Sequence, residues 1–229
     1  MHKMSGMHTK FPLVLALGAL FLAGCASTGQ SPKTEWDGLV LQPGTRLNAV
    51  FVRPSAEAEI VAFRNVLIDP VSVSFARDFD PNRRGCGASQ RLDSDDLAAI
   101  KDNLAATFRE VFREELASGG YALVDKAGPE TLRVTAAIVD LFINAPDTMS
   151  AGRSRTYTAN SGRMTLVVEL RDSDTDEILA RAVDTRTGRG TGTFTVTNRV
   201  TNTADARRAI RVWAQALRQG LDDLYKRAG

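Results

Sequence analysis

Acid–base chemistry in this sequence would depend on carboxylates, because histidine is almost absent. The two histidines, His2 and His8, lie within the first ten residues, in a segment that we predict below to be removed. The remaining chain therefore has no Ser-His-Asp or Cys-His catalytic site and no histidine-ligated zinc site. Paired carboxylates can still act as acid and base, and four lie in or near predicted strands: Asp69, Asp78, Asp140 and Asp184. Because acids at strand ends more often serve turns or the surface, we predict no catalytic residue and no enzyme.

An aspartate triplet starts like a calcium-binding loop. Asp172, Asp174 and Asp176 have the D-x-D-x-D spacing, but Glu177 stands where the loop needs glycine and Val183 where it needs a bidentate glutamate. We therefore interpret residues 171–176, RDSDTD, as a charged hairpin turn and predict no metal site.

Two further motifs also lack residues that their chemistry requires. The stretch GRGTGTF at 188–194 has Thr193 where a phosphate-binding loop has its third glycine. Ser154 follows only the first glycine of a nucleophile elbow, and no histidine would activate it. We predict no bound cofactor.

Cys86 lies in the polar stretch RRGCGAS. Neighbouring arginines would lower the pKa of an exposed thiol, and a single cysteine can pair with another chain. We favour an incidental loop residue, because a nucleophilic cysteine needs a base that this sequence lacks.

Cys25 has the most specific surroundings of any residue. The apolar run before it, residues 11–23, would reach about 20 Å as a helix, which is short of the roughly 30 Å hydrocarbon core of a bilayer. Lys3 and Lys10 precede this run without any acid, as in a secretory signal peptide. Residues 22–25, Leu-Ala-Gly-Cys, resemble the lipobox of bacterial lipoproteins. The alternative is an ordinary signal peptide with a chance cysteine.

The lipobox resemblance implies cleavage between Gly24 and Cys25, a diacylglycerol group on the cysteine sulfur, and acylation, as by palmitate, of the new amino terminus. Several acyl chains give stable membrane anchoring where one is marginal. Ala26 after the cysteine favours the outer membrane, facing the periplasm, by the sorting rule of enterobacterial lipoproteins. We thus predict a signal peptide over residues 1–24 and a lipidated, flexible tether over residues 25–45, where Trp36 and Leu39 dock on the domain or on a partner.

Loss of Lys3 and Lys10 would leave equal numbers of basic and acidic residues. A neutral, mixed surface gives no reason to expect nucleic acid as a partner.

Residues 46–229 are predicted to form a single α/β (α+β) domain. Apolar residues recur at helical spacing over 94–118, with Ser94 as N-cap and Gly119-Gly120 as the stop, and again over 203–226. Strand patterns cover 59–69, 71–75, 121–124, 131–143, 163–170 and 177–187. Residues 144–160 form a long connection that is either functional or mobile, and residues 188–198 are a loose strand or a flexible loop. We expect a two-layer sandwich with a mostly antiparallel or mixed sheet of about five strands and two main amphipathic helices.

Residues 36–225 resemble the family of bacterial lipoproteins known as domain of unknown function 3313. The resemblance rests on VLIDPVSVSF (66–75), GGYALVDKAGPETLRVTAAIVDLFINAPD (119–147), MTLVVELRDSDTDEILARAVD (164–184) and WAQALRQGLDDLY (213–225). Asp176 stands where this family usually has a turn glycine. The resemblance implies an envelope lipoprotein and supplies no activity, cofactor or catalytic residue.

The function that follows is a non-enzymatic, lipid-anchored protein on the periplasmic side of the outer membrane, which binds or supports an envelope partner. The alternative is a periplasmic ligand-binding protein, or a hydrolase that uses carboxylates with the 144–160 loop.

Overall fold

The computed structural model describes residues 35–80, 82, 92–143, 156–158, 162–187, 195–197 and 199–229. The predicted lipidation site Cys25, the cleavage site at Gly24, and Cys86, Ser154 and Thr193 lie outside these residues. The chain from Lys33 onward forms one compact unit.

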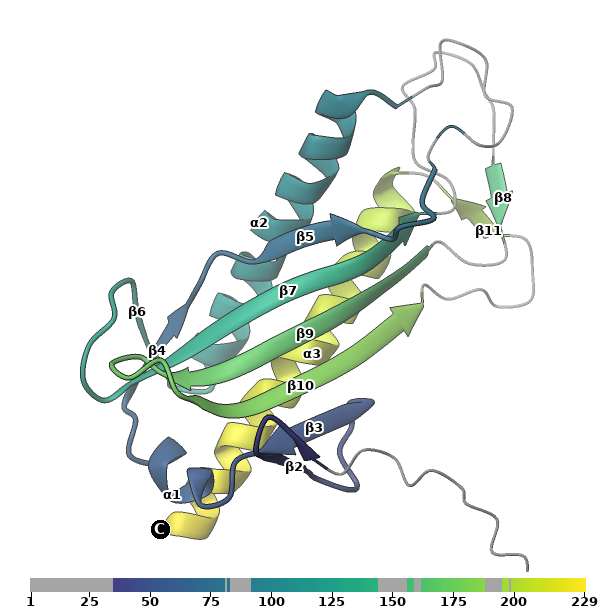
Figure 1. Cartoon of the computed structure of the whole chain (residues 1–229). Coiled ribbons are helices and arrows are strands. Elements are labelled where there is room, and N and C mark those ends of the chain that lie inside the picture. The colour runs from purple at the N-terminus through teal and green to yellow at the C-terminus, as the bar shows by residue number, and fades with distance from the viewer. Residues whose placement is uncertain are drawn as a thin grey trace, which may run out of the picture. The chain divides into compact units, whose positions relative to one another are not determined.

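A mixed sheet of nine strands is the centre of the described part of the chain (Figure 1). Its order is β1-β2-β3-β10-β9-β7-β4-β6, and β5 pairs with β7 beside β4. The bounds are β1 Glu35–Trp36, β2 Leu39–Leu41, β3 Ala49–Val52, β4 Asn65–Ile68, β5 Ser72–Phe75, β6 Ala122–Val124, β7 Thr131–Ile143, β9 Gly162–Asp172 and β10 Ile178–Thr187. The short strands β8 (Thr156–Thr158) and β11 (Thr195–Thr197) form a separate antiparallel pair. The predicted class of fold is confirmed, whereas the expected number of about five strands was too low.

Strand β7 shows why the sheet has one buried face. Leu132, Val134 and Ile138 are almost fully buried and alternate with half-buried Arg133 and Thr135, so the apolar residues share one face. β7 pairs antiparallel with β9 and parallel with β4 and β5. β4 and β5 lie along the same edge of β7, with the break between them at Pro70, whose nitrogen has no hydrogen to donate to the sheet.

Three helices complete the fold: α1 (Ala56–Ile60), α2 (Ser94–Ser118) and α3 (Arg199–Ala228). α2 has the predicted bounds, but its N-cap is Asp93 rather than Ser94. The Asp93 side chain accepts from the backbone N–H groups of Asp95 and Asp96, and the Asp96 side chain accepts from the backbone of Asp93. Gly119 ends the helix as predicted, while α3 is longer at both ends than its predicted range. None of the helices in the described part of the chain is long and apolar enough to span a membrane.

The helices α2 and α3 run parallel and cover the same face of the sheet (Figure 1). Two contacts establish this direction: Arg207 of α3 pairs with Glu110 of α2, and Arg218, further along α3, pairs with Glu115, further along α2. The core between the layers contains Phe108 and Phe112 from α2, stacked at 4.0 Å between ring centroids, and Trp213 from α3.

The first part of the domain differs from its prediction. The sheet begins at Glu35, so β1 and β2 occupy part of the predicted tether, 25–45. Leu39 is buried and Trp36 makes an edge contact with Phe51 at 5.6 Å between centroids. The strand predicted over 59–69 is also shorter, because Glu59 and Ile60 end α1 and only Asn65–Ile68 form β4.

Candidate functional site

A cleft of about 910 Å³ opens where the first halves of α2 and α3 pass the ends of β7, β9 and β10. Leu104, Leu141 and Met164 line it and are less than a tenth exposed, so the cleft reaches the core between the two layers. Val212 of α3 lines it as well and is 40% exposed. This size lies near the upper end of the range for small-molecule sites, about 300–1,000 Å³.

Residues on one side of α2 and on one side of α3 form the walls of the cleft. Asp96, Asn103, Thr107 and Glu110 follow one another on α2 at intervals of seven, four and three residues, which places them on one side of the helix. Asp205, Arg208 and Val212 follow one another on α3 at intervals of three and four residues, so they also share one side of their helix. The cleft therefore has an apolar floor and polar rims.

Each carboxylate on the rims already has a partner. Asp96 caps α2, Asp205 pairs with Arg208, and Glu110 accepts hydrogen bonds of 2.8 and 3.0 Å from the two terminal nitrogens of Arg207. The hydrogen bonding from Arg207 lowers the pKa of Glu110.

Two arginines at the cleft keep donors that no close carboxylate uses. Arg211 lies 3.9 Å from Glu114, which is its only ion pair within the described ranges. Arg163 lies with its guanidinium 6.0 Å from the centre of the Phe142 ring and has no ion pair to a described residue. Because a guanidinium has five N–H donors, both side chains can still bind an anion.

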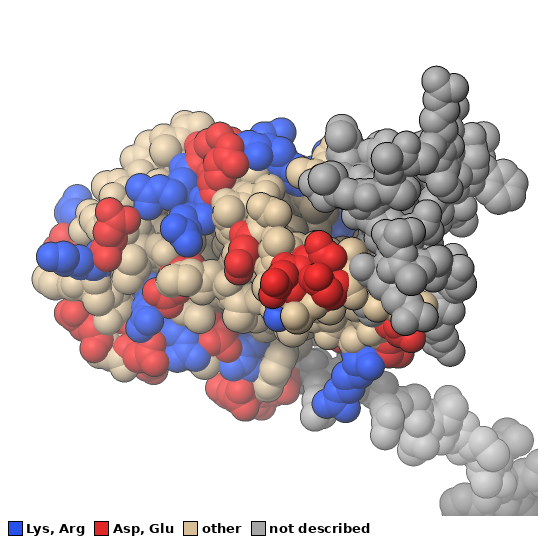
Figure 2. All heavy atoms as spheres, turned by 90° about the horizontal axis from the view of Figure 1, so that it is seen from above, with Lys and Arg blue, Asp and Glu red and all other residues tan. Residues whose placement is uncertain are grey.

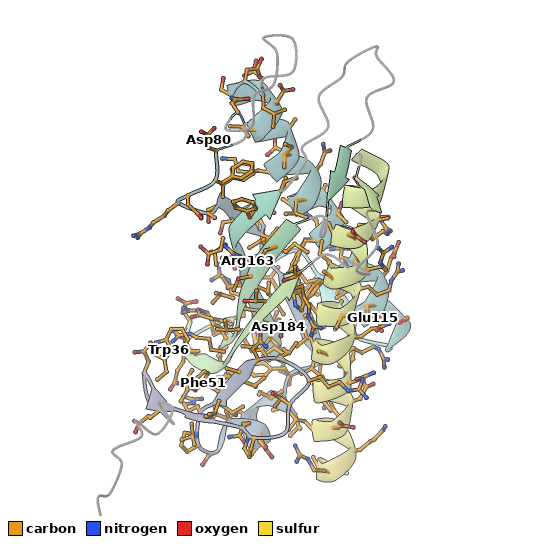
Figure 3. All side chains as sticks on the ribbon, turned by 90° about the vertical axis from the view of Figure 1, so that its right-hand side faces the viewer. Trp36, Phe51, Asp80, Glu115, Arg163 and Asp184 are labelled. Carbon is orange, nitrogen blue, oxygen red and sulfur yellow. The ribbon has the colours of Figure 1, made fainter. Side chains whose placement is uncertain are left out.

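Asp184, one of the predicted carboxylates, is only 2% exposed and lies between β10 and α3 (Figure 3). The indole N–H of Trp213 donates to its Oδ2 at 2.8 Å, Nε of Arg186 donates to the same oxygen at 2.5 Å, and the backbone N–H of Asn48 donates to Oδ1 at 2.9 Å. This carboxylate joins α3, β10 and the chain before β3. Its oxygens are occupied, so its role is structural.

Asp69 lies on the other face of the sheet. Arg133 and Thr135 donate to its carboxylate at 2.7 and 3.0 Å, and both alternate along β7 with residues that face the helices. The backbone N–H of Asp69 donates to the carbonyl of Val134, which fixes Asp69 beside that point of β7. Asp140 lies six residues beyond Val134, and at the rise of a strand this separates Asp69 from Asp140 by about 20 Å.

Asp140 and Asp78 are exposed, the first at a bulge in β7 with a positive φ of 52° and the second just after β5. The structure thus does not bring the four predicted aspartates together. The acid and base pair that the hydrolase alternative would need is therefore not formed by these four residues.

The aspartates of the calcium-like motif form the predicted turn between β9 and β10. Asp172 accepts from the backbone N–H groups of Asp174 and Thr175 at 2.7 and 3.2 Å. Asp176 has a φ of 59°, which explains why glycine suits this position. The described residues contain no group of three side chains able to hold a metal ion.

A chain of opposite charges crosses the sheet face away from the helices. Glu169 accepts from Arg181 at 2.8 Å and from Arg171 at 2.9 Å, and Arg171 and Arg133 both pair with Asp176. Arg181 also pairs with Asp37 at 2.9 Å and lies 4.1 Å from the ring centre of Trp36. Figure 3 shows Trp36 and Phe51 together, away from α3. On the face of the described residues seen in Figure 2, acidic and basic side chains are interspersed.

Sequence reasoning did not find the cleft. Its α2 residues lie on the polar flank of an amphipathic helix, and nothing in the sequence shows that α2 and α3 run parallel. The available signal was the set of alanines that line the cleft, Ala99, Ala106, Ala206 and Ala209; alanine is too common in helices to indicate a site.

The model of the family described as "Protein of unknown function (DUF3313)" matches residues 37–217. The chain belongs to the DUF3313 family. The matched part includes every residue named as lining the cleft, and it includes Asp184 and Trp213. The resemblance proposed from the sequence is therefore confirmed.

Several solved structures are similar to this DUF3313 protein. The PelC dodecamer from Paraburkholderia phytofirmans has a TM-score of 0.36 at 12% identity, with 69% of this chain and 89% of that chain covered. Protein XCC0632 from Xanthomonas campestris has a TM-score of 0.35 at 16% identity, with 68% and 82% covered. A minor lipoprotein from Acinetobacter baumannii has a TM-score of 0.29 at 11% identity, with 68% and 91% covered. No curated protein matches the chain. Similarity at this level says nothing about function.

Proposed function

We propose that this DUF3313 protein is a non-enzymatic binding protein, held by lipid at Cys25 on the periplasmic side of the outer membrane, and that it engages an envelope component through the cleft. The observation that carries this proposal is the cleft itself, with an apolar floor and rims on which, among the described residues, Arg163 has no ion pair and Arg211 has only a long one. A floor of this kind gains free energy by burying apolar surface, at roughly 25 cal/mol per Å².

The sequence of residues 22–25 supports the anchor. Palmitate labelling of the wild type and of Cys25→Ala in cells, followed by separation of inner and outer membranes, tests it directly. We expect label on the wild type alone and wild-type protein in the outer membrane. Equal labelling of both proteins would refute the anchor.

Photocrosslinking from the cleft tests the binding role. A photoreactive amino acid replaces Ala99, which is exposed and lines the cleft, in the full chain in its native envelope. The matched control replaces Lys126, which is exposed on the connection between β6 and β7, outside the cleft. We expect a recurrent product from position 99 that position 126 does not give. The absence of any product specific to position 99, in growing and stationary cells, would refute the proposal.

A further inference from the structure

The shape and chemistry of the cleft restrict what it can hold. We infer that its occupant is a lipid with a single acyl chain and an anionic phosphate head group, the chain lying on the apolar floor and the phosphate between Arg163 and Arg211. This inference rests on the proposed function, because it names the component that the cleft binds.

The floor favours an acyl chain over an extended peptide. An extended peptide brings one N–H and one C=O group per residue, and each needs a partner when it is buried. Leu104, Leu141 and Met164 offer none. The hydrocarbon part of an acyl chain has no polar group and leaves nothing unsatisfied on such a floor.

The contact between α2 and α3 disfavours a partner helix. A helix with its side chains is about 10–12 Å across, and α2 and α3 are joined beside the cleft by the paired hydrogen bonds from Arg207 to Glu110. A helix seated on the floor would have to separate the two helices and break this ion pair.

The length of the cleft suits one chain. From Asp96 to Glu110 the α2 wall rises about 20 Å at the helical rise. One leaflet of a bilayer provides about 15 Å of hydrocarbon, half of its roughly 30 Å core, so an acyl chain of membrane length fits with space for a head group.

The charges of the rims decide the sign of the head group. Asp96, Glu110 and Asp205 are engaged, as described above, whereas Arg211 has one long ion pair and Arg163 has none to a described residue. Guanidinium groups bind phosphate oxygens through paired N–H donors. A neutral head group would leave these donors to water.

The test uses the full mature lipoprotein, reconstituted in vesicles of phosphatidylethanolamine that contain a trace of lysophosphatidylglycerol with a photoreactive acyl chain. After illumination, mass spectrometry locates the adducts. We expect them on residues of the cleft floor, such as Ile100 and Met164. A photoreactive monoacylglycerol, which lacks the phosphate, serves as the uncharged probe, and we expect it to label about tenfold less, equivalent to about 1.4 kcal/mol.

Two matched pairs of variants separate a specific site from general lipid contact. Val212→Trp fills the cleft, whereas Val40→Trp changes a valine that is almost equally exposed, 41% against 40%, on β2. We expect Val212→Trp to reduce cleft labelling about tenfold and Val40→Trp to leave it unchanged. Circular dichroism and thermal unfolding verify that each variant folds.

The second pair tests the head group. The double variant Arg163→Gln with Arg211→Gln removes the two proposed phosphate ligands, and Arg109→Gln removes an exposed arginine of α2 that does not line the cleft. We expect the double variant to bind the charged probe about tenfold less and the control to bind as the wild type does.

Three results would overturn the inference: equal labelling by the charged and the uncharged probe, equal labelling of Val212→Trp and Val40→Trp, or adducts confined to residues outside the cleft. A crosslink from position 99 to a protein, without any lipid adduct in the cleft, would overturn the lipid inference and leave the proposed function standing. No crosslink specific to position 99 would remove both.

Discussion

The buried carboxylate of Asp184 holds three parts of the chain together, and its removal should be among the most damaging single changes in this fold. In Asp184→Ala, the indole N–H of Trp213 and the backbone N–H of Asn48 lose their acceptor. Nε of Arg186 loses its carboxylate too, but that side chain is one-third exposed and can turn to water.

The expected magnitude follows from these contacts. A buried donor without a partner costs about 1–3 kcal/mol, and Trp213 is only 1% exposed. With a smaller contribution from Asn48 and little from Arg186, we expect Asp184→Ala to lower the free energy of unfolding by about 3 kcal/mol. Asp184→Asn keeps the shape and one acceptor oxygen, so we expect a loss of about 1–2 kcal/mol.

Urea unfolding followed by far-ultraviolet circular dichroism measures these differences. Asp174→Ala, an exposed aspartate in the β9–β10 turn, is the control and should change stability by less than about 0.5 kcal/mol. In a double-mutant cycle with Trp213→Phe, we expect a coupling of about 1–2 kcal/mol, because the two side chains share one hydrogen bond. A loss below about 1 kcal/mol for Asp184→Ala, or additive effects in the cycle, would refute this account.

Other positions give further expectations. Burial raises the pKa of Glu169, but hydrogen bonds from Arg171 and Arg181 outweigh it and hold the pKa below 4.5. The stabilisation from this carboxylate is therefore complete above the unfolded pKa and lost as the pH falls through the folded one. Thermal unfolding from pH 7 to 3 should show Glu169→Gln less stable at neutral pH, with the difference from wild type shrinking below about pH 4.5; a constant difference would contradict this. A Cβ at Gly162, which has a φ of 148°, would overlap the carbonyl oxygen of Phe142, so Gly162→Ala should destabilise by more than about 2 kcal/mol. Gly220→Ala, in the open interior of α3, should instead stabilise by about 0.5–1 kcal/mol. The urea midpoint should therefore fall for Gly162→Ala and rise for Gly220→Ala, and a shift of both midpoints in the same direction would contradict this. Trp36→Ala removes the contacts with Phe51 and Arg181; we expect a loss of about 1–2 kcal/mol and faster proteolysis of the β1–β2 hairpin, and an unchanged cleavage rate would argue against its docking.

The long elements could be predicted because their periodicity is local. The apolar stripe and the glycines at its end are enough to define 94–118, and the alternation from Leu132 to Ile138 indicates the strand over 131–143. The turn at 171–176 was recognisable because aspartates bind neighbouring backbone N–H groups. Strands of two to four residues, such as β1, β2 and β3, complete less than two periods of alternation, so they were missed and the sheet was predicted too small.

The sequence by itself determined which residue types are present and where they stand along the chain. Histidine is confined to residues 2 and 8, and residues 22–25 resemble a lipobox that ends at Cys25. Only the tertiary structure decided where the remaining groups meet. It directs Asp184 inward to Trp213, keeps Asp69 on the opposite face, and sets α2 and α3 parallel so that their first halves and the ends of three strands enclose the cleft. The physical reason is that residue types and the spacing of apolar residues can be read along the chain. The order of the strands, the relative direction of the helices and the face of the sheet that each side chain joins arise from long-range packing.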